Sequence, residues 1–231
     1  MNLVLKDTIS NLFTERFGLK PLLFFSPGRI NLIGEHTDYN NGFVFPAAID
    51  KGIYAAIEVS ETAETQLLAF DLHEEFTLDL NKVKPLAIGS WQNYLLGVVS
   101  EIQKRGRTLK NFNFVFGGDI PNGAGLSSSA ALENALVFGL NTLFELGFRK
   151  EEMIAISQKA EHHFVGVQCG IMDQYASMFG QVETAILLDC LDLSSTPFKI
   201  NFKDYELLLI NSNVKHSLSE SCLLYTSDAA D

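Results

Sequence analysis

A short glycine- and serine-rich stretch constrains the fold of this chain more than any other feature. The segment Pro121–Ala131, PNGAGLSSSAA, follows the apolar run Phe112–Phe116 and precedes leucines at helical spacing. A strand, a loop and a helix in this order place unpaired backbone N–H groups, the positive end of the helix dipole and three hydroxyls around one point. Glycine allows a sharp turn and the close approach of a ligand. The segment therefore predicts a phosphate-binding loop that opens a helix.

The same loop, taken alone, is also typical of an ordinary serine-capped helix. It has neither the Gly-Lys-Ser/Thr ending of a P-loop nor the glycine spacing of a dinucleotide-binding loop. The phosphate interpretation depends on two further polar segments of the chain, which both make sense around a phosphoryl group.

The first of these segments is Arg29–Gly42, RINLIGEHTDYNNG, which concentrates a guanidinium, two carboxylates, an imidazole and several amides. Adjacent sugar hydroxyls are well matched by carboxylates and amides at fixed geometry. We expect Ile30, Leu32 and Ile33 to anchor the backbone in a core, so that the polar groups line a cleft. The alternative is a solvated loop whose Asn-Asn-Gly forms a hairpin turn.

The second segment is Gly166–Tyr175, GVQCGIMDQY, in which we expect Asp173 about one turn into a helix. Such a carboxylate either caps the helix or takes part in chemistry. Cys169 is expected to be a small buried thiol, because no Cys-His-Asn arrangement accompanies it. On the preceding helix, Glu161 is either on an exposed face or a ligand of a magnesium ion. The two histidines after it lack the spacing of a zinc helix motif.

The apolar pattern predicts the remaining elements. Helices are expected at Met1–Leu19, from Trp91 to Arg105, from the serine-rich loop to about Leu146, and from Lys150 to about Val165; strands are expected at Leu22–Ser26, Phe43–Ala48, Tyr54–Val59, Phe76–Leu80, Phe112–Phe116, Ala185–Asp189, Phe198–Phe202 and Glu206–Asn211.

Composition excludes several classes of partner. The chain of 231 residues is 47% hydrophobic, enough for one large domain, and its formal net charge is −11 without a local cluster of Lys and Arg. Nucleic acid and anionic membranes are therefore not expected as partners. No apolar run approaches the ~20 residues that cross a bilayer. Three scattered cysteines fit neither a disulfide framework nor a zinc site, so a reducing compartment, the cytoplasm, is expected.

Together the three segments resemble the galactokinase family, which shares a superfamily with homoserine, mevalonate and phosphomevalonate kinases. The resemblance is carried by GRINLIGEHTDYN at residues 28–40, by Pro121–Ala131 and by CGIMDQ at residues 169–174, and it extends from the first helix to about Leu218. It implies an α+β fold of two domains, with the active site between them. The first domain would be of the ribosomal-protein-S5-domain-2-like type, with a left-handed βαβ crossover.

The resemblance also implies a division of the chain. Residues 1–205 would form the N-terminal kinase domain and residues 206–221 the start of a truncated second domain. The family pattern breaks after Asn213–Leu218, and residues 222–231 look like one reading frame of a sequencing adapter. We expect these last ten residues to be a read-through tail of an incomplete gene fragment, and the isolated polypeptide to aggregate or to be inactive.

The activity that the resemblance implies is transfer of the ATP γ-phosphoryl group to the anomeric hydroxyl of galactose. Asp173 would be the catalytic base and Arg29 would steady the reacting oxygen and the phosphoryl group. The other implied residues are Glu35, His36, Thr37, Asp38 and Gly170 for the sugar; Gly123, Ala124, Gly125, Leu126, Ser127, Ser128 and Ser129 for ATP, with Trp91 near the adenine; and Ser129 with Glu161 for Mg²⁺.

Two other functions are compatible with the sequence. One is a kinase for a related sugar such as N-acetylgalactosamine, and the other is a non-catalytic sensor that binds galactose and ATP. The intact loop and Asp173 favour an enzyme over the sensor. We expect galactose and ATP as the binding partners, and a monomer.

Overall fold

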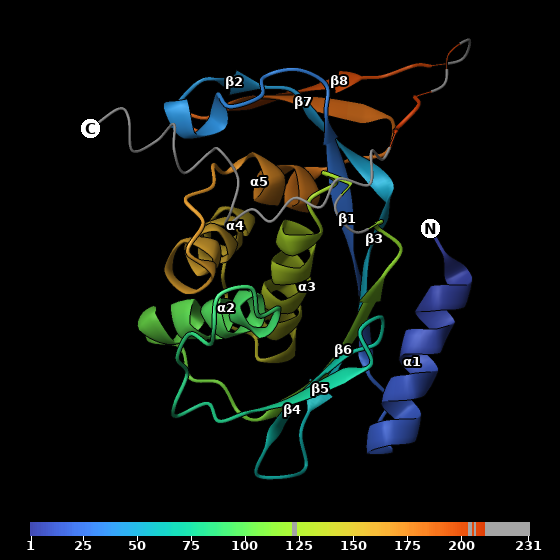
Figure 1. The fold of residues 1–231 in the computed structure, drawn as a ribbon, viewed down its shortest axis with the longest axis vertical. Helices are drawn as coiled ribbons and strands as arrows, with labels where there is room; N and C mark the ends of the chain where they lie inside the picture. The colour runs from blue at the N-terminus through green and yellow to red at the C-terminus, as the bar shows by residue number, and fades with distance from the viewer. Residues whose placement is uncertain (122–123, 203–204, 206, 211–231) are drawn as a thin grey trace.

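The computed structural model describes residues 1–121, 124–202, 205 and 207–210, which form one mixed sheet of eight strands with helices on both of its faces (Figure 1). The helices are α1 (Leu3–Phe17), α2 (Gln92–Lys104), α3 (Ser128–Leu143), α4 (Lys150–Ala160) and α5 (Met172–Phe179), with a 3₁₀ turn η1 (Asp38–Asn40) and a π-helical turn η2 (Glu161–Val165); the strands are β1 (Leu22–Asn31), β2 (Phe43–Val44), β3 (Pro46–Val59), β4 (Thr65–Ala69), β5 (Glu74–Leu78), β6 (Phe112–Gly118), β7 (Thr184–Asp189) and β8 (Ser195–Lys199).

The long strand β3 organises the sheet. It pairs antiparallel with β1, β6 and β7, while β4 runs parallel to β6 and β5 closes that edge against β4. Residues 52–57 of β3 are all buried. Such a continuous buried run indicates a strand covered on both faces. The strand therefore forms the middle layer of the molecule.

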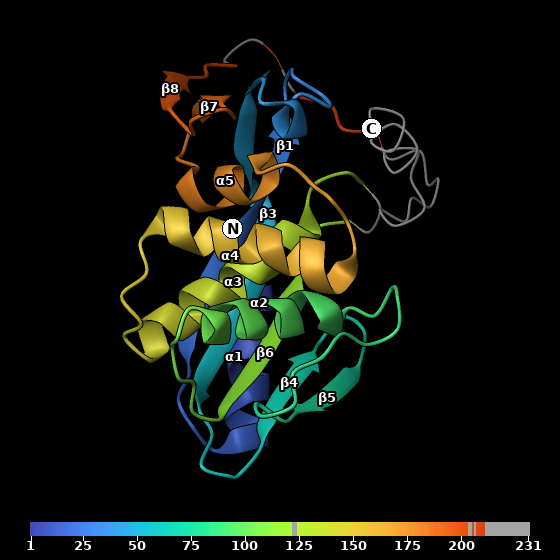
Figure 2. The same cartoon turned by 90° about the vertical axis from the view of Figure 1, so that its left-hand side faces the viewer.

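The two faces of β3 pack against different helices. Ala55 and Ile57 belong to the large core under α2, α3 and α4, whereas Tyr54 and Ala56 belong to the cluster that α1 covers. Figure 1 shows α1 alone on one side of the sheet, and Figure 2 shows α2, α3, α4 and α5 stacked over the other side. Because neighbouring strand residues point to opposite faces, both cores share the same strand.

Several strands differ from those expected. The two strands expected at Phe43–Ala48 and Tyr54–Val59 are instead the short β2 and the long β3, because pairing with β1 runs across the intervening residues apart from a bulge. Strand β4 was not predicted, and β5 and β8 begin earlier than expected. The strand expected at Glu206–Asn211 is wrong over residues 207–210, which have no ladder partner and expose their apolar side chains.

The structure does not describe most of the residues on which two expectations depend, the start of a second domain and the read-through tail. Residues 206 and 211–231 lie outside the described residues, and with them the expected second-domain start and the expected read-through tail. The domain boundaries therefore stay predictions. Among the helices that the structure describes, none has the length and apolarity needed to cross a membrane.

Substituting Gly97 should destabilise the fold, because a Cβ built there lies 2.6 Å from the Cβ of Ala160 and would push α2 away from α4. We expect Gly97→Val to lower the free energy of unfolding by about 1–3 kcal/mol. The matched control is Ser100→Val, which puts the same branched side chain on a partly exposed face of α2. Urea unfolding followed by circular dichroism measures both, and equal losses would contradict the prediction.

Candidate active site

The carboxylate of Asp173 lies where three elements meet. Arg29, near the end of β1, brings its Nε to 2.7 Å from Asp173 Oδ1, and Ser127, at the start of α3, donates its hydroxyl to Asp173 Oδ2 at 2.6 Å. Asp173 itself is the second residue of α5, earlier in that helix than expected. Its side chain is 29% exposed, so the carboxylate is held on both oxygens and remains open to a ligand.

The glycine-serine loop is held against β1 by its backbone. The Arg29 guanidinium donates to the carbonyl of Gly125 at 2.7 Å, and the Arg29 backbone N–H donates to the carbonyl of Leu126 at 3.1 Å. Gly28 makes this contact possible, because a Cβ there would lie 2.6 Å from the Leu126 carbonyl oxygen. The loop therefore follows the strand end closely.

Ser127 has an unusual backbone conformation for a residue with a side chain. Its φ of 57° lies in the left-handed region, and its hydroxyl makes no hydrogen bond to the helix that it precedes. Left-handed conformations are unfavourable for most residues and cluster at functional sites. The alternative of a serine cap is thus wrong for Ser127, whose hydroxyl binds Asp173 instead.

A cavity of about 400 Å³ opens beside Asp173. It is lined by Arg29, Ile30, Asn31, Glu35, His36, Asp38, Tyr39, Ala124, Gly125, Leu126, Val167, Gln168, Cys169, Gly170, Met172, Asp173 and Leu209. All three polar segments of the sequence contribute to this wall. The predicted sugar segment, phosphate loop and aspartate segment therefore converge on one cavity.

Asp38 and Gly170 fit against each other on this wall. A Cβ built at Gly170 would overlap the Asp38 carboxylate, so only glycine allows the observed approach. Burial, and then the charge of Asp173, raise the pKa of Asp38. Nearby, His36 Nδ1 lies 2.8 Å from the hydroxyl of Tyr39. The cavity thus combines two neighbouring carboxyl groups with an imidazole and a phenol.

Asn31 is a cavity residue that the sequence reasoning did not single out. Its amide nitrogen and oxygen are buried and have no hydrogen-bond partner in the structure. Arg29 and Asn31 are two positions apart on β1, so they point to the same face. That alternation could have identified Asn31 as a second polar group beside Arg29.

The anchors of the sugar segment differ from those expected. Ile30 is buried, but Leu32 is 37% and Ile33 is 69% exposed, so the prediction that these two side chains enter a core is wrong. β1 ends at Asn31, and the chain then runs over the surface. Backbone hydrogen bonds hold it there: Leu32 N–H donates to the Phe45 carbonyl, and Phe45 N–H donates to the Ile33 carbonyl.

Six of the residues predicted for ligands do not line this cavity: Thr37, Trp91, Ser127, Ser128, Ser129 and Glu161. Thr37 Oγ1 lies 2.7 Å from the carbonyl oxygens of Gly34 and of Phe43, so it binds within its own loop. Ser128 begins α3 and is exposed. Trp91 is the residue before α2, and its indole N–H donates to Glu74 at 2.6 Å. Gly123 lies outside the described residues.

Glu161 is only 3% exposed, so the alternative of an exposed helical face is wrong. Burial raises its pKa, and hydrogen bonds with Cys169 and Ser129 partly oppose that rise. Cys169 is partly exposed on the cavity wall, so the expected buried thiol is wrong in that respect, although desolvation raises the pKa of its thiol. Among the described residues, no group of three or more His, Cys, Asp and Glu side chains is arranged to hold a metal. Glu161 and Ser129 together offer two oxygen ligands.

Two family models match the parts of the chain that contain the three polar segments. Residues 11–59 match the family model of the galactokinase galactose-binding signature, and residues 93–181 match that of the GHMP kinases N terminal domain. The galactokinase of Thermosipho africanus is 46% identical over 197 residues, which are 85% of this chain and 54% of that protein. The resemblance to the galactokinases is confirmed.

Other galactokinases are similar over nearly the whole chain. That of Bacillus subtilis is 40% identical over 222 residues, 94% of this chain and 56% of that protein. The crystal structure of Lactococcus lactis galactokinase complexed with galactose is 36% identical and superposes with a TM-score of 0.89 over 99% of this chain and 59% of that one. The chain therefore spans a little over half the length of the galactokinases that it matches.

The fold class is confirmed as α+β by the same galactokinase structure. Methanococcus jannaschii mevalonate kinase has a TM-score of 0.65 at 19% identity, over 78% of this chain and 56% of that one. At this identity the likeness concerns the fold alone. This chain therefore shares its fold with that mevalonate kinase over most of its length.

We expect Gly170→Ala to drive the Asp38 carboxylate out of its pocket. Because burial and the charge of Asp173 raise the pKa of Asp38, its displacement should lower that pKa toward the ordinary value. A ¹³C-carboxyl NMR titration measures the change. The control is Gly139→Ala, where a Cβ makes only ordinary contacts at 3.5 Å. An unchanged Asp38 titration in Gly170→Ala would contradict the tight fit described above.

Proposed function

We propose that this chain carries the sugar site, the phosphate loop and the catalytic aspartate of a galactokinase, which transfers the ATP γ-phosphoryl group to the anomeric hydroxyl of galactose. The observation that supports the proposal most is the position of Asp173. Its carboxylate, bound to Arg29 and Ser127, lies between the loop that suits a phosphate and the segment that suits a sugar. We further propose that residues 1–205 form the kinase domain.

The sugar would be held by the polar residues of the first segment. Glu35 and His36 line the cavity beside Asp38, and Asn31 presents an amide without a protein partner. A carboxylate accepts hydrogen bonds from hydroxyls, while an amide both donates and accepts. A sugar hydroxyl can therefore donate its hydrogen to a carboxylate and accept a hydrogen bond from an amide. Gly170 leaves room for Asp38 in this arrangement.

Asp173 would take the proton of the anomeric hydroxyl. Arg29 and Ser127 each occupy one carboxylate oxygen, and the remaining lone pairs are free to accept from a ligand. Arg29 also provides positive charge where negative charge develops on the sugar oxygen and on the phosphoryl group. Phosphoryl transfer depends mainly on such positioning and charge neutralisation, which this arrangement supports.

The triphosphate would lie along the glycine-serine loop. Residues 123–129 precede and open α3, whose first N–H groups lack partners within the helix and attract phosphate oxygens. Trp91 remains our proposal for a contact near the adenine, although the structure places its indole beside Glu74. ATP is the co-substrate that this family relationship supports.

The oxygens of Ser129 and Glu161 fit a magnesium ion better than a softer metal. Mg²⁺ is commonly bound through one or two carboxylates together with substrate phosphates and water. Burial raises the pKa of Glu161 and the Ser129 hydroxyl partly opposes that rise, so the two groups lie near each other. When bound, the ion would neutralise charge on the phosphates, and the two residues would orient it.

The proposal is tested in the protein translated from the complete reading frame that contains this chain. ATP, Mg²⁺ and galactose should yield a sugar 1-phosphate detectable by ³¹P NMR, with N-acetylgalactosamine as the competing substrate. Failure to phosphorylate either sugar would overturn the proposal, and a preference for N-acetylgalactosamine would overturn its choice of sugar.

Asp173→Asn should lower turnover by at least about 10²-fold, because a neutral amide cannot act as the base. Galactose binding, measured by calorimetry, should persist. Asp7→Asn is the control, since Asp7 is an exposed residue of α1 on the opposite side of the sheet. Near-normal turnover of Asp173→Asn would remove this residue from the mechanism.

A further inference from the structure

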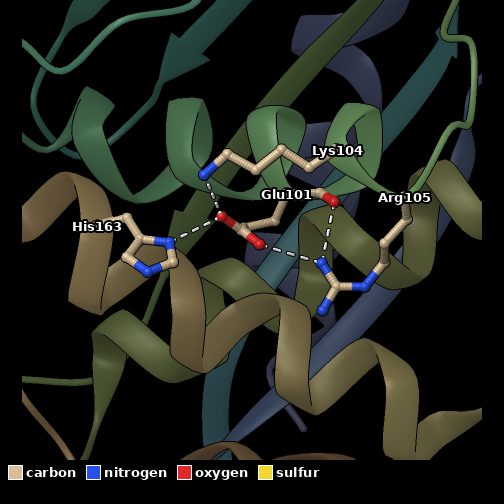
Figure 3. A network of polar contacts seen from close by, with 4 residues as sticks. All are labelled: Glu101, Lys104, Arg105 and His163. Carbon is tan, nitrogen blue, oxygen red and sulfur yellow. Dashed lines mark hydrogen bonds and ion pairs between the residues drawn. The ribbon is translucent and has the colours of Figure 1, made fainter.

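A buried carboxylate at the end of α2 gathers three basic side chains. In this cluster, hereafter the Glu101 cluster, Glu101 Oε1 accepts from Lys104 Nζ at 2.7 Å and lies 2.9 Å from His163 Nδ1, and Glu101 Oε2 accepts from Arg105 Nη1 at 3.1 Å (Figure 3). The Glu101 side chain is only 4% exposed. Burial alone would raise the pKa of Glu101, but the hydrogen bonds from Lys104 and His163 lower it overall.

The donors of the Glu101 cluster have different origins. Lys104 is three residues and Arg105 four residues beyond Glu101, so both bonds stay within the end of α2. His163 belongs to η2, the π-helical turn after α4. Among the polar contacts of Figure 3, the one with His163 alone joins two elements that are far apart in the sequence.

The turn η2 is closed by its own backbone. The N–H groups of Gly166 and Val167 both donate to the carbonyl of Glu161, at 2.9 and 3.2 Å, and Gly166 has a left-handed φ of 85°. π-helical turns are rare and are frequent at functional sites. This turn carries both the buried Glu161, whose pKa is raised by burial and partly lowered by Ser129 of α3, and His163, whose ring contacts Glu101 of α2. It therefore connects the Glu101 cluster with the proposed magnesium ligands.

We propose that His163 is a positioning residue, which holds η2 against Glu101 and thereby fixes the Glu161 carboxylate beside Ser129 for a phosphate-bound divalent cation. The proposal rests on the function proposed above. Partners that orient metal ligands contribute strongly to metal affinity, and their loss typically costs about 10–100-fold. His163 acts here through the backbone of the turn and does not touch the cation.

The first test uses amide hydrogen exchange in the protein translated from the complete reading frame that contains this chain. His163→Ala should speed exchange of the Gly166 and Val167 amides several-fold, because the turn loses its polar contact with α2 and keeps only the packing of Phe164 in the core. Lys104→Ala is a matched control, since it removes a donor from the same Glu101 oxygen but leaves η2 attached. His163→Asn, whose side-chain N–H can replace Nδ1–H, should restore most of the protection. Equal exchange in His163→Ala and the wild type would overturn the proposal.

The second test measures binding of the divalent cation in the protein from the complete reading frame. Mn²⁺ serves as the probe, titrated by electron paramagnetic resonance in the presence of a non-hydrolysable ATP analogue. We expect His163→Ala to weaken Mn²⁺ binding by about tenfold or more, with the affinity for galactose unchanged. Lys104→Ala should bind Mn²⁺ as the wild type does.

The outcomes separate this inference from the proposed function. Faster exchange at Gly166 with unchanged Mn²⁺ affinity would overturn the positioning role, as would a wild-type protein that binds no Mn²⁺. A wild-type protein that binds Mn²⁺ with the nucleotide but phosphorylates no sugar would overturn the proposed function alone. Weaker binding of Mn²⁺ and of galactose together in His163→Ala would indicate general loss of structure and would also overturn the inference.

Discussion

The ion pair between Arg29 and Asp173 is the interaction on which the rest of the candidate site depends. It joins the end of β1 to the first turn of α5, and the same guanidinium reaches the glycine-serine loop through Gly125. The two side chains are 13% and 29% exposed. Removing water from paired charges costs free energy, which close hydrogen bonds must offset. Ser127 supplies such a bond to Asp173, and the Gly125 carbonyl accepts one from Arg29. The glycine-serine loop therefore stabilises the ion pair, and the ion pair in turn holds the loop in place.

The architecture explains why these groups meet. β1 and α3 both pack on β3, and α5 packs on β1 and α3, so the three segments are brought to one end of the helical layer. Segments separated by more than 90 residues of sequence thus share a cavity of about 400 Å³. The relationship to galactokinases concerns this same arrangement, since the two family models cover β1 with the sugar segment and α3 to α5.

Much of the site could be predicted because its residues form compact segments. Glycines and serines around 125–129 indicate a helix that opens onto a ligand, and the density of polar groups after Arg29 indicates a cleft. What could not be predicted depends on long-range packing. Nothing local distinguishes Ile33, which is exposed, from Ile30, which is buried. The pairing of Glu101 with His163 joins positions 62 residues apart, and no periodicity indicates it. Strand β4 lies between β6 and β5 and is buried at four of its five positions, so it was missed because so short a run shows no alternation of apolar and polar residues.

The left-handed backbone of Ser127 has a consequence for how this protein could change. The left-handed conformation costs a residue with a side chain roughly 1–2 kcal/mol. In Ser127 that side chain carries the hydroxyl that binds Asp173. Glycine would relax the backbone and forfeit the contact. Selection for thermal robustness and selection for the proposed catalysis would therefore favour different residues at this one position, and a library screened only for heat resistance would lose the contact with Asp173.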